Sequence, residues 1–207
     1  MQEKFLKAIE ELRKLPKRNF EQSVELIINL RDFDVRKESL NLFVQIPHKA
    51  KDNKVCAFLE RPSKHFDFCI TKAEMDNWQD KKQIKNLGKG YDYFVSLASI
   101  MSKVATQFGR VLGPQGKMPS PQLGVLTTQD DSKERELAEK IRNTVRVKTK
   151  EPSIKLVIGR EKMAEKELAE NAVVVYNAVM AALPKKRENI KSILIKFTMS
   201  KPIKVEK

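Results

Sequence analysis

The sequence predicts a protein of the mixed α/β and α+β classes with two domains, the second inserted into the first. Residues 1–59 combine one helical apolar period with three strand-like segments, residues 60–152 alternate strand with helix, and residues 153–207 return to the first pattern. We therefore expect a discontinuous α+β domain made of 1–59 plus 153–207, with 60–152 inserted as an α/β domain. A chain of 207 residues is long enough to bury a core in each domain.

The first 59 residues are expected to form a helix followed by three strands. Apolar residues recur at helical spacing over 1–15, and Pro16 ends that helix. Residues 23–30 and 40–46 alternate apolar and polar side chains, as half-buried strands do, and a third strand follows at 53–59.

The inserted segment is expected to be a three-layer α/β (Rossmann-like) domain with a mostly parallel sheet. Strands are predicted at HFDFCI and YDYFVSL, and the helices AEMDNWQDKKQIKNL and ASIMSKVATQF follow them in turn. A charged helix near 132–143 and a short strand at 144–149 complete the domain. Such regular alternation gives parallel strands joined by covering helices.

The segment 109–121 is unusual because glycine and proline are concentrated in and just after it. Four of the seven glycines and three of the nine prolines lie between Phe108 and Thr128. This density predicts a long ordered loop, since both residues disfavour the interiors of helices and strands. A Walker A phosphate loop does not fit, because Val111 stands where its first glycine is needed and Met118 where its hydroxyl is needed. The glycine spacing of a dinucleotide-binding fold fails as well.

The last segment is expected to contain a strand at 151–159, a long helix ending near Leu183, a further strand and a basic tail. From Lys185 to Lys207 there are eight basic and two acidic residues. This stretch is either a solvated basic face or a surface that contacts phosphate groups, and the charge of the whole chain favours phosphate contact.

Net charge is the most unusual feature of the composition. The chain has 41 Lys and Arg against 27 Asp and Glu, a formal charge of +14, which implies a polyanionic partner. A membrane is a weaker candidate than nucleic acid, because no run of eighteen apolar residues occurs and the strongest helical segments carry many acidic residues. The N-terminal residues do not resemble a signal or transit peptide, so a cytoplasmic location is expected.

No catalytic, cofactor or metal motif is found. The chain has neither G-x-S-x-G nor H-E-x-x-H, so we expect a binding protein and not an enzyme. Cys56 and Cys69 lie in apolar runs and are expected to be buried, inert thiols in a reducing compartment. His48 and His65 do not complete the spacing of a zinc site with them.

A few residues are candidates for contact with a nucleic acid on their own chemistry. Lys17, Arg18 and Lys49 are expected in loops of the first domain, where they would extend its basic surface. Phe20 lies between cations and a strand, and is either a core residue or a platform on which a base stacks. Its context alone favours the core.

Three separated segments resemble the ribosomal protein L-one family of the large ribosomal subunit. They are NFEQSVELIINL (19–30), GRVLGPQGKMPSP (109–121) and KFTMSKPIKV (196–205), and the likeness runs over essentially the whole chain. Lys117 in GKMP resembles the archaeal branch. The resemblance implies a structural constituent of the large subunit without a cofactor, whose discontinuous domain binds ribosomal RNA of the mobile lateral stalk. It also implies contact with exit-site tRNA, because the stalk assists the release of deacylated tRNA. Two further implications are that the protein represses its own messenger RNA and that it is a monomer outside the ribosome.

The resemblance also implies specific site residues. Phe20, Ser23 and Glu25 match the first RNA-contacting segment, and Thr198 with Met199 match the second, which makes Phe20 a contact residue after all. Glu25 would orient a neighbouring cation or accept a hydrogen bond from a ribose hydroxyl. The segment that is most diagnostic of the family comprises Gly109, Gly113, Pro114, Gly116, Lys117, Met118 and Pro119.

The sequence departs from the family pattern in three places. Ser200 and Lys201 stand where the family has Gly-Pro, so Ser200 is expected to weaken a close approach to RNA or replace it with a hydroxyl hydrogen bond. The segment 46–54 lacks the glycines expected after its histidine, so the resemblance gives no role to Lys49. Only RPSK (61–64) separates two strands between which the family has a helix, so the inserted domain is expected to lack one helical cover.

Overall fold

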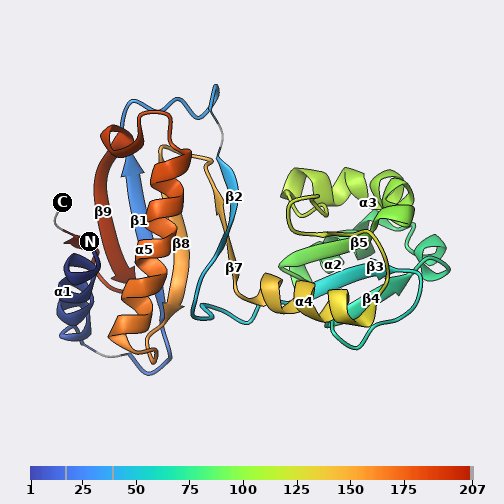
Figure 1. The fold of residues 1–207 in the computed structure, drawn as a ribbon, viewed down its shortest axis with the longest axis horizontal. Coiled ribbons are helices and arrows are strands. Elements are labelled where there is room, and N and C mark those ends of the chain that lie inside the picture. The colour runs from blue at the N-terminus through green and yellow to red at the C-terminus, as the bar shows by residue number, and fades with distance from the viewer. Residues whose placement is uncertain (17, 39, 206–207) are drawn as a thin grey trace. The chain divides into compact units, whose positions relative to one another are not determined.

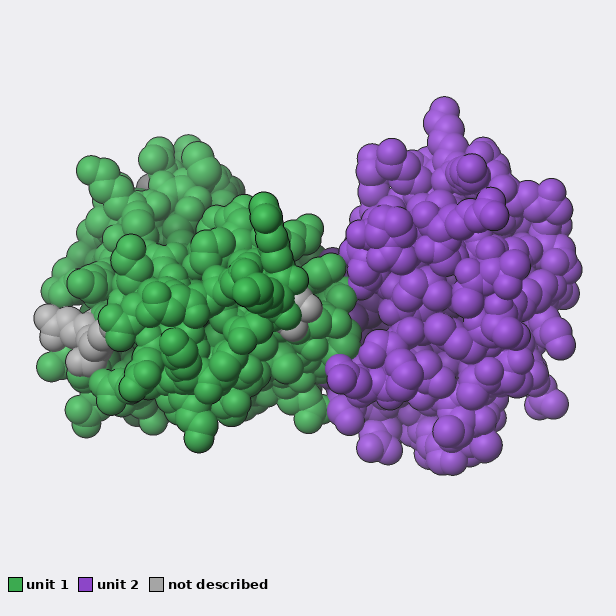
Figure 2. Space-filling view, turned by 90° about the horizontal axis from the view of Figure 1, so that it is seen from above, with its two compact units in different colours: residues 1–51, 143–207 green, residues 52–142 purple. Residues whose placement is uncertain are grey.

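The computed structural model describes residues 1–16, 18–38 and 40–205. It is a mixed α/β protein, which confirms the predicted fold class (Figure 1). The chain divides into two compact units, called here unit 1 (residues 1–51 with 143–207) and unit 2 (residues 52–142), shown in Figure 2.

The boundaries of the units differ from the predicted boundaries at 59/60 and 152/153. Strand β3 (Val55–Leu59) belongs to unit 2, because it pairs in parallel with the two strands β4 (Phe68–Thr71) and β5 (Tyr93–Leu97). Strand β7 (Thr144–Lys148) belongs to unit 1, because it pairs antiparallel with β2 (Asn41–Gln45). The predicted placement of the 144–149 strand in the inserted domain is therefore wrong.

Unit 1 is built on a four-stranded antiparallel sheet. The strands lie in the order β10–β9–β1–β8, and their bounds are β1 (Ser23–Leu30), β8 (Ser153–Arg160), β9 (Ile190–Phe197) and β10 (Ile203–Val205). Helix α1 (Gln2–Arg13) packs on the β9–β10 side, and α5 (Glu165–Ala182) packs on β8 and on α1. Figure 1 shows α5 lying along the sheet. The short helix η3 (Lys186–Asn189) precedes β9.

Alternation along β1 separates the two faces of this sheet. Val24, Leu26 and Ile28 are fully buried in the core with apolar residues of α1 and α5. The residues between them are only half-buried and form the opposite face, which is called here the open face. The predicted strand pattern at 23–30 is thus confirmed.

The loop after β2 is fastened to α5 by one asparagine. The side chain of Asn171 is fully buried. Its Oδ1 accepts a hydrogen bond from the backbone N–H of His48 at 3.1 Å, and its Nδ2 donates to the carbonyl oxygens of His48 and Ile158, both at 2.8 Å. Three backbone groups of two segments therefore depend on one side chain.

Unit 2 has a parallel sheet in the order β4–β3–β5–β6, where β6 is Val125–Leu126. All five residues of β3 are buried, as expected for a central strand covered on both faces. The helices are α2 (Lys81–Gly90), α3 (Met101–Gln115) and α4 (Asp131–Arg142), with single turns η1 (Glu74–Asn77) and η2 (Ala98–Ile100).

Two details of unit 2 differ from a regular alternation of strands and helices. The predicted helix AEMDNWQDKKQIKNL is two helices, η1 and α2, because Asp80 caps α2 by accepting from the N–H of Lys82 at 2.8 Å. Residues 60–67, all described, form bends and no helix between β3 and β4. Phe68, which opens β4, stays 37% exposed and stacks on Tyr91 with ring centroids 5.8 Å apart.

The expected long loop over 109–121 is wrong for its first half. Helix α3 continues to Gln115 and contains Gly109, Gly113 and Pro114. Val104, Phe108 and Leu112, spaced four residues apart, are fully buried on one face of α3. Their burial outweighs the cost of about 1 kcal/mol for each helical glycine.

A left-handed residue ends α3. Gly116 has φ 69°, and the N–H groups of Gly116 and Lys117 donate to the carbonyls of Gly113 and Leu112 at 2.8 and 2.9 Å. This is the C-terminal arrangement for which glycine is preferred. Only the segment after Gly116 is non-helical, and it leads through the half-buried Met118 and the buried Pro119 to β6.

Candidate nucleic-acid interface

Two chain segments far apart in sequence lie side by side at one end of the sheet in unit 1. Ser23 opens β1, and Thr198 follows β9, 175 residues later. The N–H of Thr198 donates to the carbonyl of Ser23 at 3.1 Å, and the N–H of Ser23 donates to Thr198 Oγ1 at 3.3 Å. The two predicted contact segments are therefore brought together by strand pairing.

Phe20 and Met199 place large apolar side chains in solvent on these segments. Phe20 is 53% and Met199 61% exposed, so the alternative of a core position for Phe20 is wrong. The backbone near Met199 is fixed, because its N–H donates at 3.2 Å to Oε1 of the buried Gln22. The exposed aromatic ring of Phe20 is suited to stacking on an unpaired base.

Ser200 uses its hydroxyl inside the turn that follows β9. Its Oγ accepts from the N–H of Phe197 at 2.9 Å, and its own N–H donates to the carbonyl of Phe197 at 3.1 Å. The side chain thus shapes the turn that presents Met199. Lys201 is exposed directly after it.

Glu25 points from β1 onto the open face beside a lysine of the neighbouring strand. It lies directly opposite Lys196 in the strand register, and its Oε2 is 3.8 Å from Lys196 Nζ. Both side chains are half-buried. This ion pair agrees with the expected role in which Glu25 orients a neighbouring cation.

Three lysines on the open face were not singled out in the sequence, although two of them lie in the basic stretch 185–207. Lys155 on β8, Lys196 on β9 and Lys204 on β10 lie opposite Ile27, Glu25 and Leu194, which all belong to that face. The signal that would have found Lys155 and Lys196 is the alternation in their strands, continued across the pairing.

The charge surplus of the chain is concentrated in unit 1. Unit 1 has 26 Lys and Arg against 15 Asp and Glu, and unit 2 has 15 against 12, so they carry +11 and +3 of the formal +14. The unit that carries Phe20 and Met199 is therefore the one suited to bind a polyanion.

The three basic residues that were predicted to lie in loops of the first domain have different surroundings. Arg18 is exposed on the segment that leads into β1. Lys49 is exposed in the loop that Asn171 holds on α5, where the neighbouring His48 Nε2 lies 2.7 Å from Glu170 Oε2. Lys17 lies outside the described residues.

The lysine of the glycine-rich segment contacts backbone oxygens within unit 2. Lys117 Nζ donates to the carbonyls of Gly88 and Tyr91 at 2.8 and 2.7 Å. These carbonyls end α2, where the helix dipole favours a positive charge. The ammonium group therefore stabilises the packing of α3 against α2.

We expect Lys117→Met to lower the free energy of unfolding of the chain by about 1.5–3 kcal/mol, the value of hydrogen bonds to a charged group. Urea unfolding followed by circular dichroism measures this. Lys85→Met, an exposed change in the middle of α2, is the control and should be close to neutral. An equal loss in both variants would contradict a capping role for Lys117.

Other kinds of site find little support among the described residues. They contain no group of three His, Cys, Asp or Glu that could hold a metal ion, and no helix long and apolar enough to cross a membrane. Burial raises the pKa of the Cys56 thiol, and burial is also the main cause that raises the pKa of Cys69. Both thiols are thereby kept in their unreactive protonated form.

The fold and this surface define a class: a two-unit protein whose discontinuous unit is strongly basic and is suited to contact nucleic acid. The model of the ribosomal protein L1p/L10e family matches residues 12–201. The chain belongs to this family, which confirms the resemblance seen in the sequence. It is accordingly a structural constituent of the large ribosomal subunit and not an enzyme.

Archaeal relatives match the chain over nearly its full length. Large ribosomal subunit protein uL1 of Pyrococcus abyssi (strain GE5 / Orsay) is 34% identical over 99% of this chain and 96% of its own. The proteins of the same name from Methanothermobacter thermautotrophicus and Pyrobaculum neutrophilum are 33% and 36% identical, each over 99% of this chain and over 100% and 94% of their own. The archaeal type predicted from Lys117 and its neighbours is thus confirmed.

Proposed function

We propose that unit 1 binds ribosomal RNA of the mobile lateral stalk near the tRNA exit site, and that the chain thereby assists release of deacylated tRNA. The observation that carries the proposal is the placement of Phe20 and Met199, both exposed, on two hydrogen-bonded segments of the basic unit. The residues proposed to contact the RNA are those that the family resemblance implies: Phe20, Ser23, Glu25, Thr198 and Met199. Outside the ribosome the chain is proposed to be a monomer.

The proposed interface combines two kinds of contact. Exposed cations such as Arg18, Lys201 and Lys204 neutralise phosphates and release counterions, which supplies affinity without sequence information. Phe20 stacks on an unpaired base, and backbone and hydroxyl groups around Thr198 fix the register of the RNA. The Glu25–Lys196 pair holds a cation at a defined position on the open face.

Binding to a stalk ribosomal RNA fragment should weaken linearly as the logarithm of salt concentration rises. Lys201→Gln and Lys204→Gln should each reduce the magnitude of that slope by about one, since each removes one phosphate contact. Filter binding at several salt concentrations measures the slope, and Lys85→Gln on the exposed surface of α2 is the control. An unrelated duplex of the same length that bound as tightly as the stalk fragment would argue against specific recognition.

A second proposed role is repression of translation through the chain's own messenger RNA, by the same surface. Two short segments recognise a small RNA fold, so a messenger that presents a similar fold can compete for them. A gel shift in which the leader transcript competes with the stalk fragment tests this. Failure of the leader to displace the stalk fragment would remove the repressor role and leave ribosomal RNA binding intact.

A further inference from the structure

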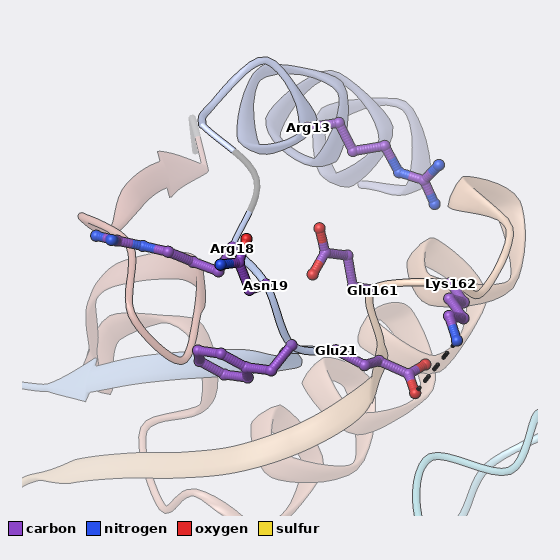
Figure 3. Close-up of a pocket in the computed structure, with 7 residues that line it drawn as sticks. Arg13, Arg18, Asn19, Glu21, Glu161 and Lys162 are labelled. Atoms are coloured by element: carbon purple, nitrogen blue, oxygen red, sulfur yellow. Dashed lines mark ion pairs between the residues drawn. The ribbon is translucent and has the colours of Figure 1, made fainter.

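A cavity of about 640 Å³ lies beside Phe20 in unit 1 (Figure 3). Its walls are the end of α1 at Arg13, the segment 18–21, and the turn between β8 and α5 with Glu161 and Lys162. This volume is within the range of about 300–1,000 Å³ that small-molecule sites occupy.

Several charged groups of the cavity are fixed by partners of their own. Arg13 Nε lies 3.3 Å from Glu165 Oε1, and its guanidinium also donates to the Met163 carbonyl. Glu21 Oε2 lies 3.9 Å from Lys162 Nζ, an ion pair drawn in Figure 3. These pairs form the structural rim of the cavity.

Glu161 is held in place but keeps capacity to bind. One carboxylate oxygen accepts from the N–H of Gln22 at 3.3 Å, and the Glu161 N–H donates to the Gln22 carbonyl at 2.9 Å. Figure 3 shows the carboxylate directed into the cavity, on the side of Asn19. Because a carboxylate offers about four lone-pair sites, most of its accepting capacity remains.

The side chains of the segment 18–20 supply complementary groups. Among the described residues, the side chains of Arg18 and Asn19 make no hydrogen bond or ion pair, and the Phe20 ring makes no aromatic contact. The cavity therefore combines an exposed aromatic face, a free amide, a fixed carboxylate and a cation. An unpaired nucleotide has matching chemistry, with a ring to stack, a polar base edge and a phosphate.

We propose that this cavity receives one unpaired guanine nucleotide of the bound RNA, an inference that rests on the proposed function. Guanine presents two adjacent N–H donors that a carboxylate accepts together, and Glu161 is that carboxylate. The amide of Asn19 pairs with the remaining polar edge of the base, Phe20 stacks on its ring, and Arg18 contacts the phosphate. Uracil presents one N–H between two carbonyl oxygens. These oxygens are repelled by the carboxylate, so uracil is disfavoured at this site.

Nuclear magnetic resonance of the ¹⁵N-labelled full chain tests the proposal with three probes: guanosine 5′-monophosphate, uridine 5′-monophosphate and ribose 5-phosphate. The guanine nucleotide should shift the amide signals of Asn19, Phe20 and Glu161 saturably. Its affinity should exceed that of the uracil nucleotide by at least about fivefold, the lower end for a bidentate base contact. Equal shifts with ribose 5-phosphate would show phosphate binding only, and the absence of saturable shifts would show no site. Either outcome overturns the proposal.

Glu161→Gln should abolish the preference for guanine, since an amide places a donor against the donors of the base. The amide oxygen can still accept from Gln22, so the fold should persist, which thermal unfolding verifies. Glu10→Gln on the exposed face of α1 changes the charge equally and should keep the preference. Retained preference in Glu161→Gln would overturn the proposal.

The affinity of the same protein samples for the stalk RNA fragment distinguishes a failure of the cavity proposal from a failure of the proposed function. Tight stalk binding without guanine binding removes the cavity proposal alone. Guanine binding without stalk binding removes both, because the nucleotide is proposed to belong to the bound RNA.

Discussion

Phe20→Ala is expected to weaken binding of the stalk ribosomal RNA by about 1–3 kcal/mol, which is roughly 5- to 150-fold, while leaving the stability of the chain nearly unchanged. Phe20 is 53% exposed and its ring has no aromatic neighbour among the described residues, so its removal costs little packing. What is lost is the stacking partner of a base. Fluorescence anisotropy with a labelled stalk fragment measures the affinity, and thermal unfolding measures the stability.

Phe68→Ala is the matched control for this experiment. Phe68 is also an exposed phenylalanine, at 37%, but it lies in unit 2 and stacks on Tyr91. Its removal should lower the stability of unit 2 and leave RNA affinity unchanged. If Phe20→Ala bound the stalk fragment as tightly as the unsubstituted chain, the interface proposed for unit 1 would be wrong in its central residue.

Asn171→Ala should lower the free energy of unfolding by about 2–5 kcal/mol, because it leaves one buried and two part-buried backbone groups without their partner at about 1–3 kcal/mol each, less what water recovers. The groups are the N–H and carbonyl of His48 and the carbonyl of Ile158. The loop after β2 should detach from α5 first. Urea unfolding measures the loss, and hydrogen exchange at His48 and its neighbours locates it.

Asn177→Ala, on the exposed face of the same helix α5, provides the control. Asn177 is exposed, so its change to alanine should raise or lower stability by no more than about 0.5 kcal/mol. Equal stability of the two variants would mean that the Asn171 hydrogen bonds do not hold the loop.

Local periodicity was sufficient to place most helices and strands, and insufficient to pair them. The alternation at 23–30 predicted both the strand and its buried face, because one face of that sheet packs on helices. The strand at 144–149 was also found, but its partner β2 lies about a hundred residues earlier in the chain. Nothing in a five-residue strand encodes which distant edge it will join, so the domain boundary was misplaced.

The glycine-rich segment shows how tertiary burial overrides local preference. Gly109, Gly113 and Pro114 argue against a helix, yet the apolar series through Phe108 and Leu112 continues among them and is buried. The helical period of these apolar residues is visible in the sequence, but the density of glycine and proline predicts a loop there. Similarly, context alone favoured a core position for Phe20, and only the resemblance to a family of RNA-binding proteins pointed to its exposure.

The hydrogen bonds between Ser23 and Thr198 set a condition on the biogenesis of this chain. Unit 2 is continuous in sequence, so it can fold while later residues are still being synthesised. The proposed RNA surface cannot form in that way, because one of its two segments is made 175 residues after the other. A nascent or prematurely terminated chain therefore lacks this surface, and if the surface binds the stalk RNA as proposed, assembly into a subunit is restricted to chains whose translation has passed residue 199.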